Sequence, residues 1–288
     1  MIQILSGQIP TRFLCNFFSI CPSSYYYWLN AEETPRFVEK NKIVKLINEI
    51  FESSRETYGS PRIYHELRSR GITVSENTVA KYMRELGLNA RLKRKFKVQM
   101  TDSNHDGPIA PRVFKTEDCN PKDYGPGELL AGDITYLKLG PKFLYLAVVM
   151  DLSNREIVGW SMSNGLETSL VLRALESAMY KTGPDAEIIF HSDRGSQYAS
   201  EAYRNFLKNN EITPSMSRKG NCYDNAYVES WFASLKNEWI RRSTYSTEKE
   251  LRGLVFEYIE IWYNKKRRHS SLDYLSPEEY RITNQKSA

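Results

Sequence analysis

The sequence predicts an α/β domain that follows an all-α arm. Three apolar runs, separated by the turn signals Gly140-Pro141 and Ser153-Asn154, predict hairpin-linked strands at residues 129–138, 143–151 and 156–163. Beyond them, apolar spacing predicts a helix, a strand, a helix and a short strand in turn, at residues 167–181, 187–192, 199–209 and 212–216. Upstream of residue 100 the periodicity is helical. These observations together indicate a mixed α and β core with a helical segment in front of it.

Composition agrees with a soluble globular protein and excludes several classes. The hydrophobic fraction of 41% and the charged fraction of 26% are ordinary, and 288 residues can bury a sizeable core. No apolar run is long enough to span a bilayer, so no membrane association is expected. Residues 1–20 lack the basic and small-residue features of a signal peptide. The four cysteines show no paired or zinc-binding spacing, which indicates reduced thiols and a cytoplasmic location.

Composition shifts divide the chain into five segments. The predicted segments are a helical N-terminal segment at 1–53, a helix-turn-helix domain with a basic tail at 54–100, a linker at 101–127, the core at 128–240, and a C-terminal helix with a basic tail at 241–288. The linker holds four Pro and three Gly with little apolar periodicity. In the first segment, Tyr25 to Trp28 could stack on bases or pack in a small core.

The helix-turn-helix pattern lies at residues 60–87. Ile63 and Leu67 give the first helix an apolar face, Gly71 ends it, and Ser75 caps the second helix. The second helix points four polar side chains outward, where they could reach DNA: Asn77, Thr78, Lys81 and Arg84. An ordinary helical hairpin has the same periodicity.

Two basic runs favour a polyanionic partner. Residues 55–97 hold eleven Lys or Arg against four Glu, and the candidate DNA contacts after the second helix are Arg91, Lys93, Arg94 and Lys95. The second run ends in Arg267 and Arg268, which are also candidate DNA contacts. Either run alone could be a solvated surface. Between them, Thr247 and Glu250 form a capping box that begins the last long helix.

Three acidic residues occupy positions that suit a metal site. Asp133 lies inside an apolar strand, Asp193 closes another, and Glu229 falls early in a helical stretch with 35 residues between it and Asp193. A buried charge is costly unless a cation meets it, so this pattern indicates divalent metal ions and phosphoryl transfer. Asp151 also ends an apolar strand, but it begins a turn and is expected to cap that turn. Lys236 lies seven positions after Glu229 on the same helix face and could hold a DNA phosphate or be solvated.

The short sequence motifs around these acids resemble those of one family. Asp133-Ile134-Thr135-Tyr136, the run from His191 to Tyr198, and the run from Lys219 to Ala226 with Glu229-Ser230 resemble the DDE transposases of bacterial insertion sequences. More narrowly, they resemble the retroviral-integrase-like kind with two reading frames, of which this chain would be the second-frame product. The resemblance covers about residues 50 to 285. Gly132 departs from it slightly, since a polar or small residue usually precedes the first Asp.

The resemblance implies a fold, an activity and partners. The fold is a ribonuclease-H-like integrase catalytic core with an N-terminal all-α helix-turn-helix arm. The activity is cleavage and strand transfer of DNA with two Mg²⁺ ions, for which Mn²⁺ can substitute. Asp133 would bridge the ions, with Asp193 on one and Glu229 on the other. The partners are element ends and target DNA, further copies of the chain on DNA, and an upstream-frame helix-turn-helix protein or fusion.

Two other functions stay open from the sequence. One is a nuclease of the ribonuclease H type, which needs neither the arm nor a basic tail. The other is a DNA-binding regulator with an inactive core, which does not need all three acids.

Overall fold

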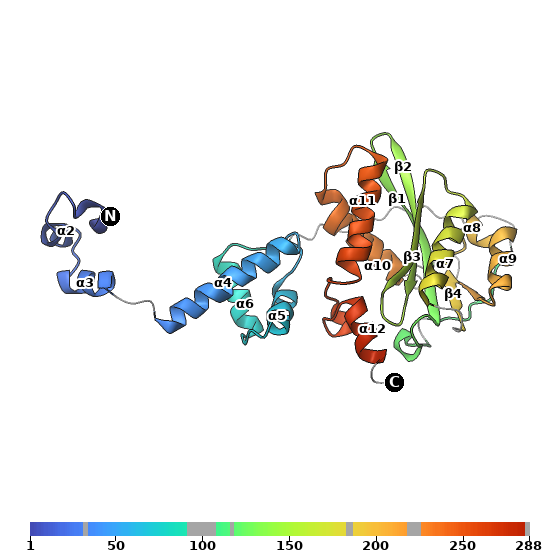
Figure 1. Ribbon diagram of the computed structural model, residues 1–288, viewed down its shortest axis with the longest axis horizontal. Helices are drawn as coiled ribbons and strands as arrows, with labels where there is room; N and C mark the ends of the chain where they lie inside the picture. The colour runs from blue at the N-terminus through green and yellow to red at the C-terminus, as the bar shows by residue number, and fades with distance from the viewer. Residues whose placement is uncertain (31–33, 91–107, 116–117, 183–186, 218–225, 286–288) are drawn as a thin grey trace.

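The computed structural model describes residues 1–30, 34–90, 108–115, 118–182, 187–217 and 226–285. Figure 1 shows three parts in chain order along the long axis: a small group of N-terminal helices, a helical arm, and an α/β core. No helix in those ranges is both long enough and apolar enough to cross a bilayer.

The core is built on one mixed sheet of five strands. They are β1 (Leu129–Leu139), β2 (Lys142–Asp151), β3 (Ile157–Ser163), β4 (Ile189–Ser192) and β5 (Thr213–Met216). The strand order is β3-β2-β1-β4-β5, antiparallel from β3 to β1 and parallel from β1 to β5. All five strands lie within two residues of the predicted ranges. This sheet confirms the expected ribonuclease-H-like α/β class.

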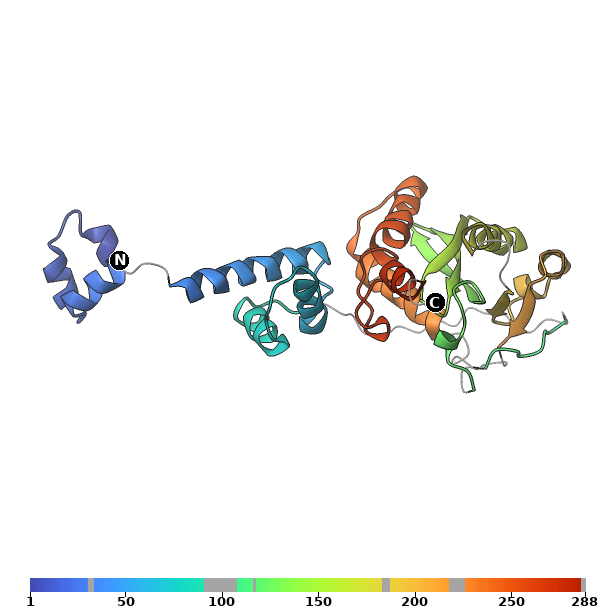
Figure 2. The same cartoon turned by 60° about the horizontal axis from the view of Figure 1, so that its bottom comes forward.

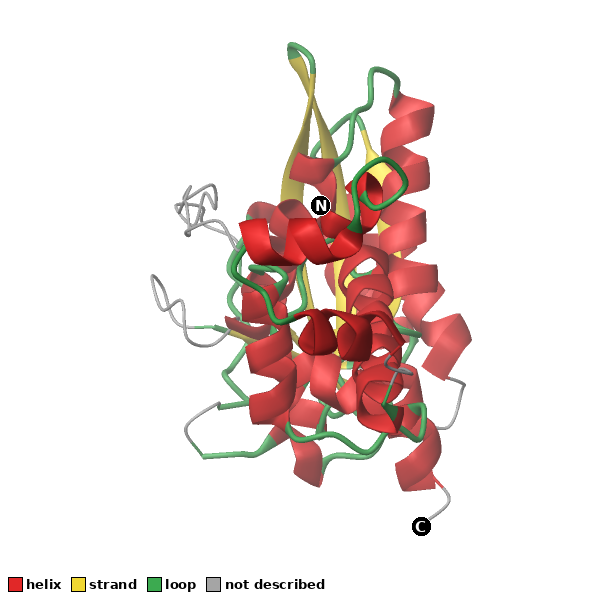
Figure 3. Cartoon of the chain, turned by 90° about the vertical axis from the view of Figure 1, so that its left-hand side faces the viewer, coloured by secondary structure: helices red, strands yellow, loops and turns green. Residues whose placement is uncertain are grey.

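Helices cover both faces of the sheet. One face packs against α7 (Thr168–Thr182) and α9 (Glu201–Asn209), and the short helix α8 (Ser196–Ala199) directly precedes α9. The other face packs against α10 (Ala226–Ser234) and α11 (Glu248–Phe256), with α12 (Pro277–Gln285) beyond them. Figure 3, seen from the side of the N-terminal helices, shows the tip of a strand hairpin projecting beyond the helices.

Two of the C-terminal helices continue into π-helical or 3₁₀ turns, which the sequence did not indicate. A π-helical turn, η2 (Leu235–Trp239), and a 3₁₀ turn, η3 (Ile240–Arg242), continue α10. A second π-helical stretch, η4 (Glu257–Tyr263), continues α11, and a 3₁₀ turn, η5 (Ser270–Leu272), follows it. The capping box of Thr247 and Glu250 forms as predicted. π-turns of this kind shift the register of a helix and often lie near functional sites.

The arm consists of α4 (Pro35–Ser53), α5 (Ser60–Ser69) and α6 (Glu76–Glu85). Ser75 caps α6 by accepting a hydrogen bond from the Thr78 backbone N–H, as predicted. Helix α4 packs on both α5 and α6. Buried side chains of all three helices belong to the same hydrophobic cluster as those of α10, α11 and η4.

The first thirty residues form a separate small cluster. Helices α1 (Ile2–Leu5), α2 (Thr11–Phe17) and α3 (Pro22–Asn30) enclose Ile2, Leu14, Cys15 and Tyr25. Figures 1 and 2 both show this group standing away from the arm. The aromatic run is therefore divided, because Tyr25 packs in this small core while Tyr27 is 81% exposed and Trp28 is 64% exposed.

The described part of the predicted linker is bound to the core. Phe114 is fully buried. The backbone N–H groups of Val113 and Phe114 donate to the Ser215 hydroxyl at 3.1 and 3.0 Å, and that hydroxyl also pairs with His191 Nδ1 at 2.9 Å. A short 3₁₀ turn, η1 (Pro121–Asp123), leads into β1. The segment acts as a strap along β5, which its Pro-rich composition did not reveal.

Candidate active site

Strand alternation places Asp133 on the sheet face that α10 covers. Leu129, Ala131 and Leu137 of β1 pack into the cluster on the α10 side, whereas Leu130 packs on the α7 side. Successive side chains of a strand point to opposite faces, so Asp133 shares the face of the odd-numbered residues. Its Oδ1 accepts a hydrogen bond of 2.7 Å from the Ile134 backbone N–H.

Asp193 lies beside Asp133 because of the register of the parallel pair. Gly132 of β1 is paired with Ser192 of β4, so the next residue of each strand is an aspartate. Adjacent strands lie about 4.8 Å apart, and partners in register share a face. Asp193 Oδ1 accepts a 2.9 Å hydrogen bond from the Gly195 backbone N–H, which orients the carboxylate at the end of the strand.

Gly132 has a packing role that explains its place before Asp133. A Cβ atom at this position would lie 2.3 Å from Cζ of Phe190. Phe190 is fully buried on the α7 side of the sheet. The glycine lets the ring pass under β1, and the departure from the family pattern is accommodated without moving the aspartate.

Glu229 comes from the first turn of α10, which packs against β1. Its side chain is exposed, whereas Asp133 and Asp193 are half-buried. Burial raises the pKa of the Asp133 carboxyl well above its usual range, and the charges of Asp193 and Glu229 raise it further. The three carboxylates therefore act on one another as like charges, and a bound cation would relieve their repulsion.

The donor set fits a hard divalent cation. All three side chains offer carboxylate oxygens, the ligands that Mg²⁺ and Mn²⁺ accept, and Mg²⁺ needs only one or two from protein. Among the residues that the structure describes, no three Asp, Glu, His or Cys side chains are arranged closely enough to hold a metal ion as they stand. Residues 218–225, directly before α10, lie outside the described ranges. The exposed Glu229 side chain is long enough to adjust to an ion held by the two aspartates.

Asp151 has a structural role, as the sequence predicted. Its buried carboxylate accepts hydrogen bonds from the Gly127 and Ser153 backbone N–H groups, at 2.8 and 2.9 Å, and from the side chains of Ser153 and Asn154. These donors hold the turn between β2 and β3, so the carboxylate is already satisfied.

Two neighbours of the acids were not singled out from the sequence. The Thr135 hydroxyl accepts a 2.7 Å hydrogen bond from Lys236 Nζ, and the Lys236 ammonium lies 4.7 Å from the ring centre of Tyr136. Tyr198 is buried, and its burial and the charges of Asp133 and Asp193 raise its pKa well above the usual value. Thr135 could have been noticed from its place within the motif that runs from Asp133 to Tyr136. A threonine in a strand, however, ordinarily reflects strand propensity.

Comparison with known proteins identifies the family. A family model described as an integrase core domain matches residues 123–222, and another of the same description matches residues 210–277. A model described as an HTH-like domain matches residues 39–96. The transposase InsF for insertion sequence IS3A of Escherichia coli (strain K12) is 37% identical over 288 residues, which cover 98% of each chain. The chain belongs to the insertion-sequence transposases.

Further similarities involve a second insertion element and two viral integrase structures. The "Insertion element IS600 uncharacterized 31 kDa protein" of Shigella sonnei is 37% identical over 268 residues, 93% of this chain and 97% of that protein. The HTLV-2 integrase catalytic core domain in complex with magnesium shares 13% identity with a TM-score of 0.43, over 55% of this chain and 97% of that one. The simian T-cell lymphotropic virus intasome in complex with the PP2A regulatory subunit B56 gamma shares 12% identity with a TM-score of 0.45, over 82% of this chain and 74% of that one.

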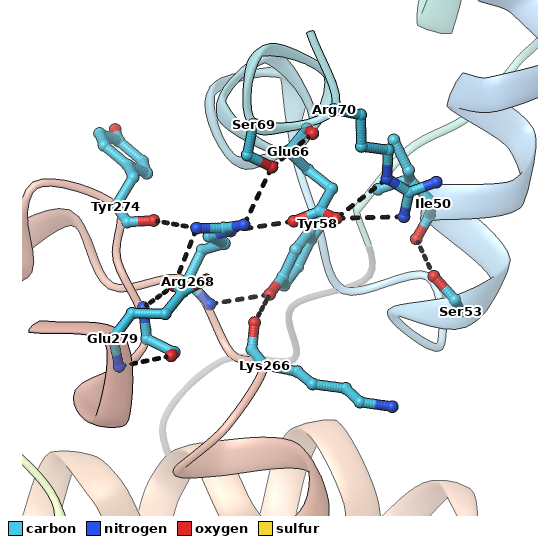
Figure 4. A network of polar contacts seen from close by, with 11 residues as sticks. Ile50, Ser53, Tyr58, Glu66, Ser69, Arg70, Lys266, Arg268, Tyr274 and Glu279 are labelled. Atoms are coloured by element: carbon cyan, nitrogen blue, oxygen red, sulfur yellow. Dashed lines mark hydrogen bonds and ion pairs between the residues drawn. The ribbon is translucent and has the colours of Figure 1, made fainter. Parts of the chain in front are cut away.

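The structure corrects the expectation that Arg267 and Arg268 contact DNA in this transposase. Arg267 is 4% exposed and donates to both carboxylate oxygens of Glu238, at 2.6 and 2.7 Å. Arg268 is 7% exposed and pairs with Glu66 and Glu279, as Figure 4 shows. Both guanidinium groups are neutralised inside the protein. The basic run is therefore half structural, and its exposed cations are Lys265 and Lys266.

The candidate DNA contacts of the arm lie mostly on the surface. Asn77, Lys81 and Arg84 of α6 are exposed, and Lys81 is 3.9 Å from Glu85 in an i,i+4 ion pair. Thr78 is half-buried and its hydroxyl pairs with Ser75 at 2.9 Å, so it contributes to the cap. The basic residues Arg91, Lys93, Arg94 and Lys95 lie outside the described residues.

Proposed function

We propose that this chain cleaves the DNA ends of its insertion element and joins them to target DNA by metal-dependent phosphoryl transfer. The observation that supports this most directly is the register of β1 and β4. It sets Asp133 and Asp193 side by side on the sheet face that the Glu229 helix covers, where burial and the charges of Asp193 and Glu229 raise the pKa of Asp133. Three neighbouring carboxylates destabilise the fold without a cation, but with one they form a ligand set for metal-ion catalysis.

In the proposed site, Asp133, Asp193 and Glu229 would hold two Mg²⁺ ions, with Asp133 serving both, Asp193 one and Glu229 the other. When bound, the ions supply charge neutralisation and alignment for an in-line displacement at phosphorus. The Gly195 N–H fixes the Asp193 carboxylate, and the Ile134 N–H fixes that of Asp133. Thr135 holds the Lys236 ammonium close to the acids, where it can bind a phosphate of the DNA strand.

DNA binding is proposed for the outer face of α6 and for the basic run after it. Asn77, Lys81 and Arg84 are available for contacts with phosphates or base edges. Two element ends have to be held together for joining, so the active form is expected to be a homo-oligomer assembled on DNA in the nucleoid. We also propose that fusion with the helix-turn-helix protein of an upstream frame adds recognition of the element ends.

A strand-transfer assay tests the proposal against its alternatives. Labelled duplexes that carry the element's ends are mixed with supercoiled plasmid, Mg²⁺ and either the chain alone or its upstream-frame fusion. Joined products that disappear with Asp133→Asn would support the transposase. Cleavage of RNA–DNA hybrids without joining would favour the nuclease, and DNA binding without any cleavage in Mg²⁺ or Mn²⁺ would favour the regulator.

A further inference from the structure

The arm is fastened to the catalytic core by a buried aromatic layer. Tyr58, between α4 and α5, packs on Trp262 of η4 with ring centres 5.8 Å apart. The Arg55 guanidinium lies 3.4 Å over the ring of Trp239. Tyr58 is 3% exposed, Trp239 4% and Trp262 9%, so the arm and the core bury one continuous surface.

A polar layer beside it is centred on Arg268. Its Nε donates to Glu66 of α5 at 2.9 Å, and its Nη2 donates to Ser69 of α5 at 3.1 Å. Its Nη1 donates to Glu279 of α12 at 3.0 Å and to the Tyr274 backbone carbonyl at 3.2 Å. Figure 4 shows this one guanidinium between the arm and the C-terminal segment. All three of its nitrogens are used, which matches the geometry that favours Arg over Lys at a buried junction.

Backbone contacts make the junction continuous. The Tyr58 hydroxyl accepts a 2.8 Å hydrogen bond from the Arg268 backbone N–H and donates to the Lys266 carbonyl at 3.3 Å. The rings of His65 and Tyr274 stack with centres 3.8 Å apart. On the other side of the interface, Arg242 donates to the Arg55 carbonyl at 2.6 Å.

The neighbouring arginine faces the catalytic helix. Arg267 is bonded to both oxygens of Glu238, which lies in the π-turn η2 that continues the Glu229 helix. Two successive residues thus hold two different units, since Arg268 binds α5 of the arm and Arg267 binds the extension of α10. The arm and the metal-binding helix are fixed to the same short segment of backbone.

From this geometry we propose that Arg268 is a positioning residue that fixes the arm against the catalytic core and thereby sets which phosphate is cut. The inference rests on the proposed transposase function. DNA held by α6 would reach the carboxylates at one distance only, because the junction leaves the arm one orientation. Without the junction, the arm still binds DNA, but the distance between the bound sequence and the cleaved phosphate is no longer fixed.

The first measurement is hydrogen–deuterium exchange of residues 60–69 in the full chain without DNA or metal. Arg268→Met is compared with wild type and with a matched control, Arg281→Met. Arg281 donates to Glu156 at 2.9 Å, but both residues lie in the core, and Glu156 keeps Lys181 as a second partner. Arg268→Met should raise exchange in α5 about tenfold, because the carboxylate of Glu66 loses its interdomain partner. Unchanged exchange in α5 would overturn the proposal that Arg268 fixes the arm against the core.

The second measurement maps cut positions on a duplex that carries the element's own end. Wild type and Arg281→Met should give one cut position, whereas Arg268→Met should spread cuts over neighbouring phosphates and Arg268→Lys should restore the single position in part. A variant that is merely unstable would lose total cutting without moving the cut. Glu66→Gln serves if Arg268→Met does not fold, since it keeps the shape and removes the charge.

The outcomes separate the two proposals. Faster exchange with an unmoved cut position would overturn the positioning role. A wild-type chain that cuts nothing in Mg²⁺ or Mn²⁺, alone or as a fusion, would remove the transposase proposal and with it the positioning role, while the exchange data would still decide whether Arg268 holds the arm.

Discussion

Lys236 reaches from the π-turn η2 to Thr135 on β1, where its Nζ donates a 2.7 Å hydrogen bond to the hydroxyl. Thr135 is two residues beyond Asp133 and therefore lies on the same sheet face. Burial, together with the charge of Arg241, lowers the pKa of Lys236 to about 8, although the charge of Asp133 opposes the shift. This half-buried ammonium lies close enough to Asp133 to feel its charge, and its proposed role is to bind a phosphate of the DNA.

Lys236→Met should lower end joining by about tenfold to a hundredfold, because a charge-assisted hydrogen bond to phosphate is lost. The salt dependence of DNA binding should fall by a slope of about one. Filter binding across a salt series and a joining assay would measure both effects. Lys236→Arg should keep most activity, and Lys208→Met, at an exposed position on α9, is the matched control. A joining rate equal to wild type in Lys236→Met would remove this role.

The same lysine predicts a pH effect on stability. A lysine whose folded pKa is below its unfolded value of about 10.4 binds fewer protons in the folded state. The free energy of unfolding therefore rises with pH between about 8 and about 10.4, where only the unfolded chain is protonated at this site. Urea titrations at pH 7.5 and 9.5 should show this gain in wild type and a smaller one in Lys236→Met.

Asp133→Asn, Asp193→Asn and Glu229→Gln should each lower cleavage and joining by at least about a thousandfold, since several kcal/mol of charge stabilisation depends on the bound ions. Folding should survive. Asp133→Asn should even hold or raise the free energy of unfolding in metal-free buffer, because it removes a carboxylate that is disfavoured by burial and by two like charges. Glu176→Gln, at an exposed acid on α7, controls for a general charge effect.

Asp151→Asn should have the opposite effect to the three metal-site variants, lowering stability but not activity. Its carboxylate accepts four hydrogen bonds in a buried turn, so an amide there should cost about 1–3 kcal/mol of stability without entering the chemistry. Thermal melts and the joining assay together separate the two kinds of aspartate. A stable but inactive Asp151→Asn would mean that the metal-site assignment is incomplete.

Metal binding should become tighter as pH rises. An acid whose folded pKa is raised binds protons more tightly in the folded state, so the Asp133 contribution to stability falls as pH rises from about 4 through the raised pKa. A divalent ion needs the deprotonated form. The rise in Tm on adding Mg²⁺ or Mn²⁺ should therefore grow between about pH 5.5 and pH 8 and be lost in Asp133→Asn.

Ca²⁺ should support DNA binding without cleavage, because its looser coordination does not align an in-line attack.

Local patterns were enough to predict the elements. Apolar runs, with turn signals between the first three, located all five strands, and the Ser75 cap and the Thr247–Glu250 capping box were predicted from residue types alone. The acids could be proposed because Asp133 and Asp193 stand out against apolar runs. Their adjacency, however, comes from the pairing of β1 with β4, which no local pattern encodes.

The arginine run shows why other features were missed. Arg268 meets Glu66 across 202 positions and Arg267 meets Glu238 across 29, so neither pairing leaves a trace in local spacing. A run of four cations is ordinarily solvated, and these two are buried only because carboxylates from distant elements neutralise them. The π-turns escaped for a similar reason, since apolar spacing does not distinguish them from an α-helix over so few residues.

Arg267→Met should destabilise the core by about 3–5 kcal/mol, because it leaves the Glu238 carboxylate buried without a partner. Glu238 is 3% exposed, and although burial raises its pKa, the Arg267 guanidinium holds that pKa below the usual value. Replacing both residues, as Glu238→Leu with Arg267→Met, should recover most of the loss. Chemical denaturation measures the cycle. A stable Arg267→Met with a reduced salt slope of DNA binding would instead restore the role in DNA contact.

Two truncations should have opposite effects on the rest of the chain. Removing residues 1–33 deletes a cluster whose buried side chains are its own, so the Tm of the remainder should change little. Removing residues 1–90 also deletes the arm, which exposes Trp239 and Trp262 to water and leaves Arg268 without Glu66. Each large apolar side chain that loses its burial contributes about 1.5–3 kcal/mol, so this second truncation should lower the Tm sharply or prevent folding. Scanning calorimetry of the two shortened chains decides the matter. If the 91–288 chain melts at the wild-type temperature, the arm and the core do not share the hydrophobic cluster that joins them here.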